Sequence, residues 1–221
     1  MLRVLQEEIT TCRACPRLVA WREQVAIEKR ASFRHEDYWG RPVAGFGDPS
    51  ARVLILGLAP AAHGANRTGR VFTGDRSGDW LFRALHRAGF ANQPTSTARD
   101  DGLELTDAYV TAAVRCAPPG NSPLPDERDR CRPFLDREVA LLPNVRVVVC
   151  LGAFAFDAAL RRWPVKPRPR FAHLAEAASV ATPGISLLCS YHPSQQNTFT
   201  GRLTEPMFDA VFSRALEVAE A

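Results

Sequence analysis

Arg52-Val53-Leu54-Ile55-Leu56-Gly57-Leu58 is the stretch of sequence that decides the fold. Its side chains are apolar at nearly every position, whereas a strand with one face in water would alternate apolar and polar residues. A continuous apolar run of this length is typical of a strand inside a parallel sheet that helices cover on both faces. We therefore predict a buried strand at residues 52–58, in an α/β fold.

The rest of the chain repeats this pattern of buried strand and helix. Further strand-like runs lie at residues 108–114, 145–151 and 185–191, and helical patterns lie at about 79–88, 126–142, 154–163 and from 204 onward. Alternation at this spacing argues for a parallel sheet with helices on both faces. No internal repeat or long linker interrupts the pattern, so residues 1–221 are expected to form a single domain.

Composition narrows the class of protein. With 46% hydrophobic and 24% charged residues, the chain resembles a soluble globular protein, and the absence of a long apolar run argues against a membrane protein. Glu7 and Glu8 interrupt the apolar pattern of the first residues, which a secretory signal would not tolerate, so a cytoplasmic location is expected. The net charge of +4 favours a polyanionic partner.

The six cysteines fall into two groups. Cys150 and Cys189 sit in strand-like runs and are expected to be small buried hydrophobes. The other four lie beside Pro, Arg and Thr and are candidate metal ligands: Cys12, Cys15, Cys116 and Cys131. Four thiolates suit either zinc or an iron–sulfur cluster, although the gap between the second two is too wide for the usual zinc ribbon.

Three segments that follow predicted strands are rich in glycine, proline and polar residues: 57–75, 115–123 and 191–204. In parallel sheets ligands bind beyond the carboxyl ends of the strands, so these segments are expected to form the functional site. They contain the runs Gly57-Leu58-Ala59-Pro60-Ala61-Ala62-His63-Gly64, Gly69-Arg70-Val71-Phe72-Thr73-Gly74-Asp75 and His192-Pro193-Ser194, the last continuing to Asn197-Thr198-Phe199-Thr200-Gly201-Arg202.

These runs, in this order and with the four cysteines, resemble a uracil-DNA glycosylase of the iron–sulfur type, closest to family five, the type B enzymes. The resemblance implies a three-layer α/β/α fold with a central, mainly parallel four-stranded sheet. It also implies a monomer that removes uracil and other deaminated or damaged bases flipped out of double-stranded DNA. The implied cofactor is a 4Fe-4S cluster, partly held by the N-terminal segment, on Cys12, Cys15, Cys116 and Cys131.

The resemblance also implies roles for individual residues. Phe72 would stack on the flipped base, Asn121 would read its edge, and His192 would donate a hydrogen bond to the departing base anion. The implied catalytic residues are Asp75, Asn121 and His192, and the implied substrate-binding residues are Gly57, Ala59, His63, Phe72, Asn121, Asn197 and Arg202. The cluster would also stiffen the segment between Cys116 and Cys131 for contact with phosphate through Arg128, Arg130 or Arg132. Taken alone, Phe72 also suits a core, Asn121 a turn, Asp75 a helix cap and His192 a structural position.

One departure from other uracil-DNA glycosylases concerns the attacking water. Most families carry Asp, Glu or Asn after the first strand, whereas residues 59–62 read Ala-Pro-Ala-Ala, so no side chain there accepts a proton. Asp75 is the nearest carboxylate in these runs and is expected to support the sugar cation, either electrostatically or also as a general base. The small apolar stretch predicts that larger bases such as hypoxanthine are accepted.

Two other function classes stay open at this point. A non-catalytic iron–sulfur protein that binds nucleic acid would explain the charge and the cysteines, but would leave Phe72, Asp75, Asn121 and His192 without a shared purpose. A hydrolase of free nucleosides would need neither the basic character nor the segment after His192.

The lysine content predicts a glycosylase without a lyase step. A lyase needs an amine to form a Schiff base with the sugar, and only two of the 28 basic residues, Lys29 and Lys166, are lysines. Neither lies in the three segments. Borohydride treatment during reaction with uracil-containing DNA is expected to trap no covalent adduct, and the product is an intact abasic strand. An adduct that disappears in Lys29→Ala or Lys166→Ala would contradict this mechanism.

Overall fold

The computed structural model describes residues 1–221 and contains one mixed six-stranded sheet of order β1-β3-β2-β4-β6-β5. The strands are β1 (Phe46–Gly47), β2 (Val53–Gly57), β3 (Ala108–Ala112), β4 (Val147–Leu151), β5 (Glu176–Ala178) and β6 (Ser186–Ser190). The central four, β3, β2, β4 and β6, are all parallel. The predicted parallel core is confirmed, with each strand slightly shorter than the sequence pattern indicated.

The prediction of a four-stranded sheet was incomplete at both edges. β1 pairs antiparallel with β3, and β5 pairs antiparallel with β6. β1 has two residues and β5 has three, and neither contains a fully buried residue. Strands this short and this exposed leave no hydrophobic period in the sequence, which is why the pattern did not reveal them.

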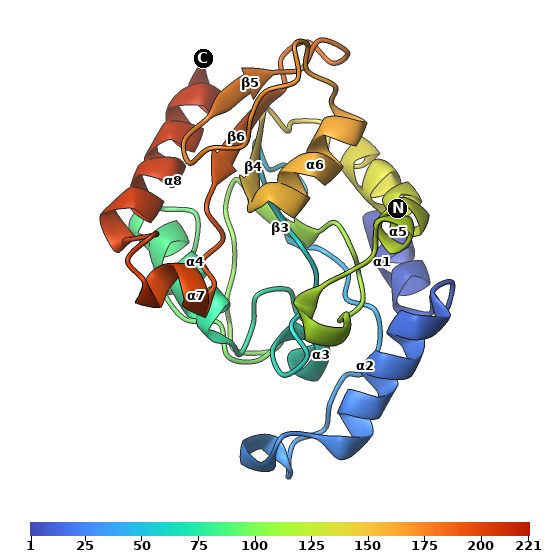
Figure 1. The fold of residues 1–221 in the computed structure, drawn as a ribbon. Coiled ribbons are helices and arrows are strands. Elements are labelled where there is room, and N and C mark those ends of the chain that lie inside the picture. The colour runs from blue at the N-terminus through green and yellow to red at the C-terminus, as the bar shows by residue number, and fades with distance from the viewer.

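Helices cover the sheet on both faces (Figure 1). They are α1 (Leu2–Thr10), α2 (Pro16–Glu28), α3 (Ala65–Thr68), α4 (Arg76–Arg87), α5 (Pro125–Ala140), α6 (Ala153–Arg162), α7 (Gln195–Phe199) and α8 (Glu205–Glu220), with short 3-10 turns at Ala31–Phe33 and Pro119–Asn121. α4 and α8 pack on one face, and α5 and α6 pack on the other with α1 beside α5. None of these helices combines the length and apolarity needed to cross a membrane.

β2 explains why the fold has three layers. All five of its residues are buried, and their side chains point alternately to the two faces. Val53 and Ile55 belong to the apolar cluster under α4 and α8, whereas Leu54 and Leu56 belong to the cluster under α5 and α6. A strand that is apolar on both sides therefore needs helices on both sides, as the sequence indicated.

A buried ion pair joins α5 to the end of β3. Arg115 and Glu138 are 1% and 0% exposed, and the guanidinium Nη2 lies 2.6 Å from the carboxylate Oε2. The Thr111 hydroxyl also donates to Oε2 at 2.6 Å, and the Tyr109 hydroxyl and the Gly45 amide donate to Oε1, each at 3.2 Å. Because so many donors converge on one carboxylate, α5 has a fixed position against β3.

Candidate active site and cysteine cavity

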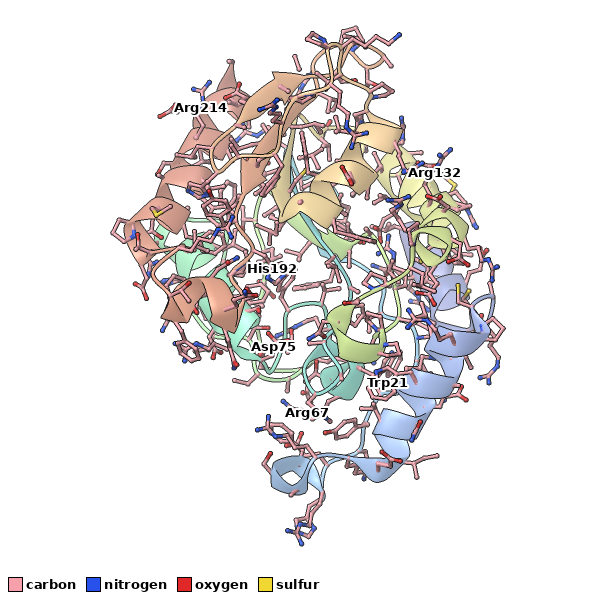
Figure 2. The ribbon with its side chains drawn as sticks, in the orientation of Figure 1. Trp21, Arg67, Asp75, Arg132, His192 and Arg214 are labelled. Atoms are coloured by element: carbon pink, nitrogen blue, oxygen red, sulfur yellow. The ribbon has the colours of Figure 1, made fainter.

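The segments that follow β2, β4 and β6 meet at the carboxyl edge of the sheet. A cleft of about 260 Å³ lies there, with Leu58, Gly152 and His192 among its lining residues. Figure 2 shows Asp75 and His192 at this end of the molecule, on segments that follow different strands. The cleft therefore combines two of the predicted segments, 57–75 and 191–204, with the segment after β4, whereas no residue of the predicted segment 115–123 lines it.

Phe72 lies beside His192, which lines the cleft. Its ring centroid is 5.9 Å from that of His192, with 33° between the ring planes. The ring also rests on Gly57, where an added Cβ would lie 2.7 Å from two ring carbons. Gly57, predicted to bind substrate, thus makes room for Phe72. Phe72 is 8% exposed, and its backbone φ is +53°. Residues other than glycine adopt this backbone conformation only at a cost in free energy.

His192 is a half-buried residue two positions beyond the end of β6. Burial lowers its pKa to about 4, so the ring is neutral near pH 7 and one of its nitrogens carries a proton. The Asn197 side-chain amide donates to the His192 carbonyl oxygen at 2.9 Å. Asn197, predicted to bind substrate, also lines the cleft, and this bond makes it a support for the His192 backbone.

Asp75 serves as the N-cap of α4. Its Oδ1 accepts a hydrogen bond from the Gly78 amide at 3.0 Å, so the helix-cap interpretation is right. The other oxygen lies against Gly64, where an added Cβ would come within 2.0 Å of Oδ2. Burial raises the pKa of Asp75, while the backbone amides of Gly78 and Ser77 act in the opposite direction. The cap therefore holds a desolvated carboxylate in place three residues beyond Phe72.

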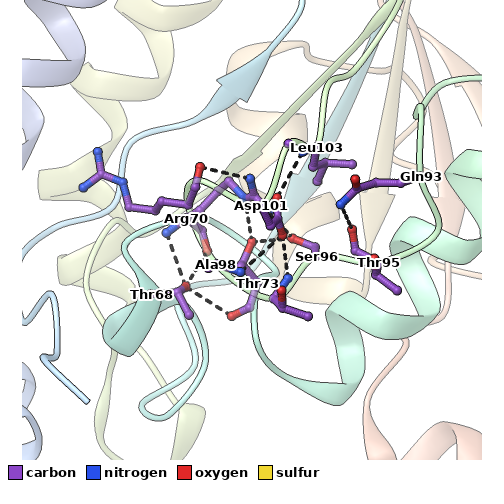
Figure 3. Close-up of polar contacts among 12 residues, drawn as sticks. Thr68, Arg70, Thr73, Gln93, Thr95, Ser96, Ala98, Asp101 and Leu103 are labelled. Atoms are coloured by element: carbon purple, nitrogen blue, oxygen red, sulfur yellow. Dashed lines mark hydrogen bonds and ion pairs between the residues drawn. The ribbon is translucent and has the colours of Figure 1, made fainter. Parts of the chain in front are cut away.

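An ion pair that the sequence did not reveal anchors the segment from Gly69 to Asp75 (Figure 3). The Arg70 Nη2 atom lies 2.8 and 2.7 Å from the two carboxylate oxygens of Asp101, and both side chains are at most 10% exposed. Although burial opposes it, hydrogen bonds from Arg70 and from three backbone amides lower the pKa of Asp101. Arg70 also donates to Ser96 and Thr73, at 2.8 and 3.0 Å.

His63 contacts a part of the chain that lies far away in sequence. Its Nδ1 is 3.1 Å from the Tyr38 hydroxyl, and burial together with the charges of Arg30 and Arg67 lowers its pKa. Arg67 donates to the carbonyl oxygens of His63 and Gly74, each at 2.9 Å. The first and second runs are thus tied together by one guanidinium.

Ala59 and Asn121 lie away from these contacts. Ala59 packs against Leu18, Val114 and Cys116 beside the cysteines. Asn121 is exposed in a 3-10 turn with a φ of +55°, and its side chain makes no hydrogen bond within the protein. The turn interpretation of Asn121 is right, and its role in reading a base stays a prediction.

The cleft has an aromatic lining that the sequence did not indicate. Phe154, Phe171 and Tyr191 contribute to its wall, and the Arg202 guanidinium lies 4.6 Å from the centroid of the Tyr191 ring. Aromatic walls with a few polar groups suit a flat heterocyclic ligand. Arg202, predicted to bind substrate, therefore lies on the cleft.

The four predicted metal ligands line one small cavity: Cys12, Cys15, Cys116 and Cys131. The Arg115 amide donates to the Cys131 sulfur at 3.3 Å, and burial raises the pKa of Cys116 to about 11 and of Cys131 to about 12. No three Cys, His, Asp or Glu side chains of the chain gather closely enough to hold a single metal ion. The cysteines thus share a cavity without converging on one point. Cys150 and Cys189 are buried on β4 and β6, as predicted.

The ion pair between Arg70 and Asp101 predicts a local effect of Asp101→Asn. Arg70 would stay buried with weaker acceptors, at a cost of about 1.5–3 kcal/mol for hydrogen bonds to a charged group. Amide hydrogen exchange across residues 70–75 is expected to accelerate at least several-fold. The matched control is Asp100→Asn, since Asp100 is exposed and makes no ion pair. Equal exchange in both variants would show that Asp101 does not hold the segment.

The lowered pKa of His192 predicts a loss of stability in acid. Between pH 6.5 and about 4 the unfolded chain binds a proton at this residue and the folded protein does not. The free energy of unfolding therefore decreases as the pH is lowered through this range. Urea unfolding at pH 7 and pH 5 is expected to show a smaller difference in His192→Gln than in the parent. His35→Gln, at an exposed position, serves as the control. A parent-like difference in His192→Gln would refute the prediction.

Comparison with known proteins places the chain in a family. Residues 44–216 match the model of the uracil DNA glycosylase superfamily. A type-5 uracil-DNA glycosylase of Mycobacterium tuberculosis is 56% identical over 96% of this chain and 79% of its own length. Enzymes of the same name from Mycobacterium leprae and Thermus thermophilus are 54% and 53% identical, covering 97% and 96% of this chain and 94% and 96% of their own. The chain therefore belongs to the uracil-DNA glycosylase superfamily, in its type-5 branch.

Proposed function

We propose that this protein removes uracil from double-stranded DNA by hydrolysing the bond between base and sugar, and that it does so as a monomer. The observation that carries the proposal is the contact of Phe72 with His192 at an aromatic cleft, with the capped Asp75 three residues beyond Phe72, in a chain more than half identical to type-5 uracil-DNA glycosylases. A base inside a duplex must leave the stack to enter such a cleft.

The three side chains suit the charges that develop in this reaction. The departing base becomes an anion, and the neutral His192 ring uses its one N–H group to donate a hydrogen bond to it. The sugar becomes cationic, and the Asp75 carboxylate, held by the N-terminus of α4, favours that charge. Phe72 offers a ring face fixed by Gly57 on which the base stacks.

The range of bases is proposed to extend beyond uracil. The cleft has a volume of about 260 Å³ and six of its ten lining residues are hydrophobic, and residues 59–62 after β2 carry no polar side chain. A mainly apolar site rejects a larger base less strongly than one built around hydrogen bonds to a single partner. Hypoxanthine in DNA is therefore proposed as a second substrate.

The cysteine cavity is proposed to hold a 4Fe-4S cluster on Cys12, Cys15, Cys116 and Cys131. Its support is the donor set, four sulfurs around one cavity with N–H groups directed at two of them. Four thiolates suit zinc as well as an iron–sulfur cluster, so the metal and sulfide content of the protein purified without oxygen decides between the two. The cluster would supply a structural link between the N-terminal segment and the region after β3.

The test is an excision assay on a duplex that carries one uracil, followed by alkali. We expect cleavage at the uracil. His192→Ala is expected to raise the activation free energy of the chemical step by about 2–4 kcal/mol, the cost of losing one such donor. Asp75→Asn is expected to slow the same step while DNA binding persists. His86→Ala, at an exposed position, is the control.

Two results would identify another class of protein, and a third would overturn the assignment of the site. Binding of the duplex without cleavage would identify a non-catalytic DNA-binding protein. Release of uracil from free deoxyuridine but not from DNA would identify a nucleoside hydrolase. Full activity in both His192→Ala and Asp75→Asn would overturn the assignment of the site.

A further inference from the structure

Arg22 is a buried cation without a carboxylate of its own. It lies in α2 and is 2% exposed. The nearest carboxylate, Glu23, is 3.8 Å away and is already engaged by two nitrogens of Arg13. The Nε atom of Arg22 has no hydrogen-bond partner. Since a buried charge is costly unless it is compensated, Arg22 needs negative charge from another source.

The guanidinium of Arg22 is directed at the cysteine cavity. Its Nη1 donates to the Cys116 sulfur at 2.8 Å, and its Nη2 donates to the Cys12 carbonyl oxygen at 3.1 Å. Arg115 also lies beside a ligand, but Glu138 neutralises its charge. Arg22 is therefore the buried guanidinium whose charge stays available to the sulfurs.

The backbone of Arg22 points the other way, toward the segment after β2. The Asn66 side-chain amide donates to the Arg22 carbonyl oxygen at 3.2 Å, and Asn66 is completely buried in α3. The Asn66 backbone amide in turn donates to the Ala61 carbonyl oxygen at 3.0 Å. One residue of α2 thus contacts the cysteine cavity with its side chain and supports the loop of the candidate active site through its backbone.

We propose that Arg22 is the counter-ion of the thiolate cavity and a positioning residue for the segment Ala59–Gly64. The proposal rests on the proposed cluster, whose four thiolates carry more negative charge than the cluster core offsets. The Arg22 N–H group stabilises the Cys116 thiolate, as hydrogen bonds to ligating sulfurs do in general. The bound cluster would hold the Arg22 side chain and so fix the position of α2. The Arg22 carbonyl oxygen in turn holds Asn66, which contacts the segment Ala59–Gly64 at Ala61.

The experiment compares Arg22→Gln, Arg22→Lys and the control Arg13→Gln, all purified without oxygen. Arg13 lies in the same region but is 62% exposed. The readouts are iron and sulfide per chain, the decay of absorbance near 400 nm under a chelator, and amide exchange across residues 59–66. In Arg22→Gln the absorbance is expected to decay about 10–100-fold faster, in line with the loss of metal affinity that follows removal of a hydrogen-bond partner of a ligand. Exchange across residues 59–66 is expected to accelerate with it.

The variants separate charge from geometry and keep the test decisive. Arg22→Lys retains the charge and is expected to decay at an intermediate rate, and Arg13→Gln at the parent rate. If Arg22→Gln does not fold, Arg22→Lys decaying at the parent rate would refute the role of the guanidinium. If the parent holds iron and Arg22→Gln decays at the same rate, the inference is wrong and the cluster stands. A parent without iron would refute the cluster itself, and the role of Arg22 with it.

Discussion

The buried pair of Arg115 and Glu138 determines how the two halves of the cysteine cavity meet. Its net contribution to stability is small, because removing two charges from water costs nearly what their attraction returns. Its geometry matters more. Glu138 fixes α5, which carries Cys131, against β3, which leads to Cys116. Gln6 of α1 donates to the Gly45 carbonyl oxygen at 2.9 Å and to the Tyr109 hydroxyl at 3.3 Å, so the same polar network orients the segment before Cys12.

Close backbone approach is the second constraint on the site. Gly57 admits the Phe72 ring, Gly64 admits the Asp75 carboxylate, and Gly78 lies so near the Phe72 carbonyl oxygen that an added Cβ would come within 1.8 Å of it. Each contact would be lost with any larger residue. The left-handed backbone of Phe72 persists because these contacts and the Arg70–Asp101 pair leave it no alternative. The segment is therefore preorganised before any ligand arrives.

The sequence predicted the parts of the molecule that follow a local pattern. β2 was clear because all its side chains are buried, and Phe72 and His192 were expected in one site because both follow strands of a parallel sheet. Asp101 was not found, since a carboxylate in a polar loop carries no sign of the buried arginine that it pairs with. The edge strands were missed because they are too short to show a period.

Burial also separates the three arginine candidates for phosphate contact, and tertiary contacts explain why the cleft wall was missed. Arg128 was one of these candidates, but it is 7% exposed, with its guanidinium 5.7 Å from the centroid of the Phe154 ring, whereas Arg130 and Arg132 are exposed. Phe171 lies in an irregular connection, where an aromatic residue gives no indication of which surface it covers. Both cases depend on tertiary contacts between segments distant in sequence.

Loss of water favours the neutral form of both His192 and Asp75, which suits the proposed role of His192 but not that of Asp75. Desolvation favours the neutral imidazole of His192, which is the form that donates a hydrogen bond to a base anion without carrying charge into the cleft. It also favours the protonated form of Asp75, which would remove the negative charge that the sugar cation needs. The N-terminus of α4 reduces this second effect, because its amides stabilise the ionised carboxylate, although the pKa of Asp75 stays above its ordinary value. Asp75 is a helix cap and a candidate catalytic residue at once, because the amides that it caps are also the groups that favour its negative charge in a buried place.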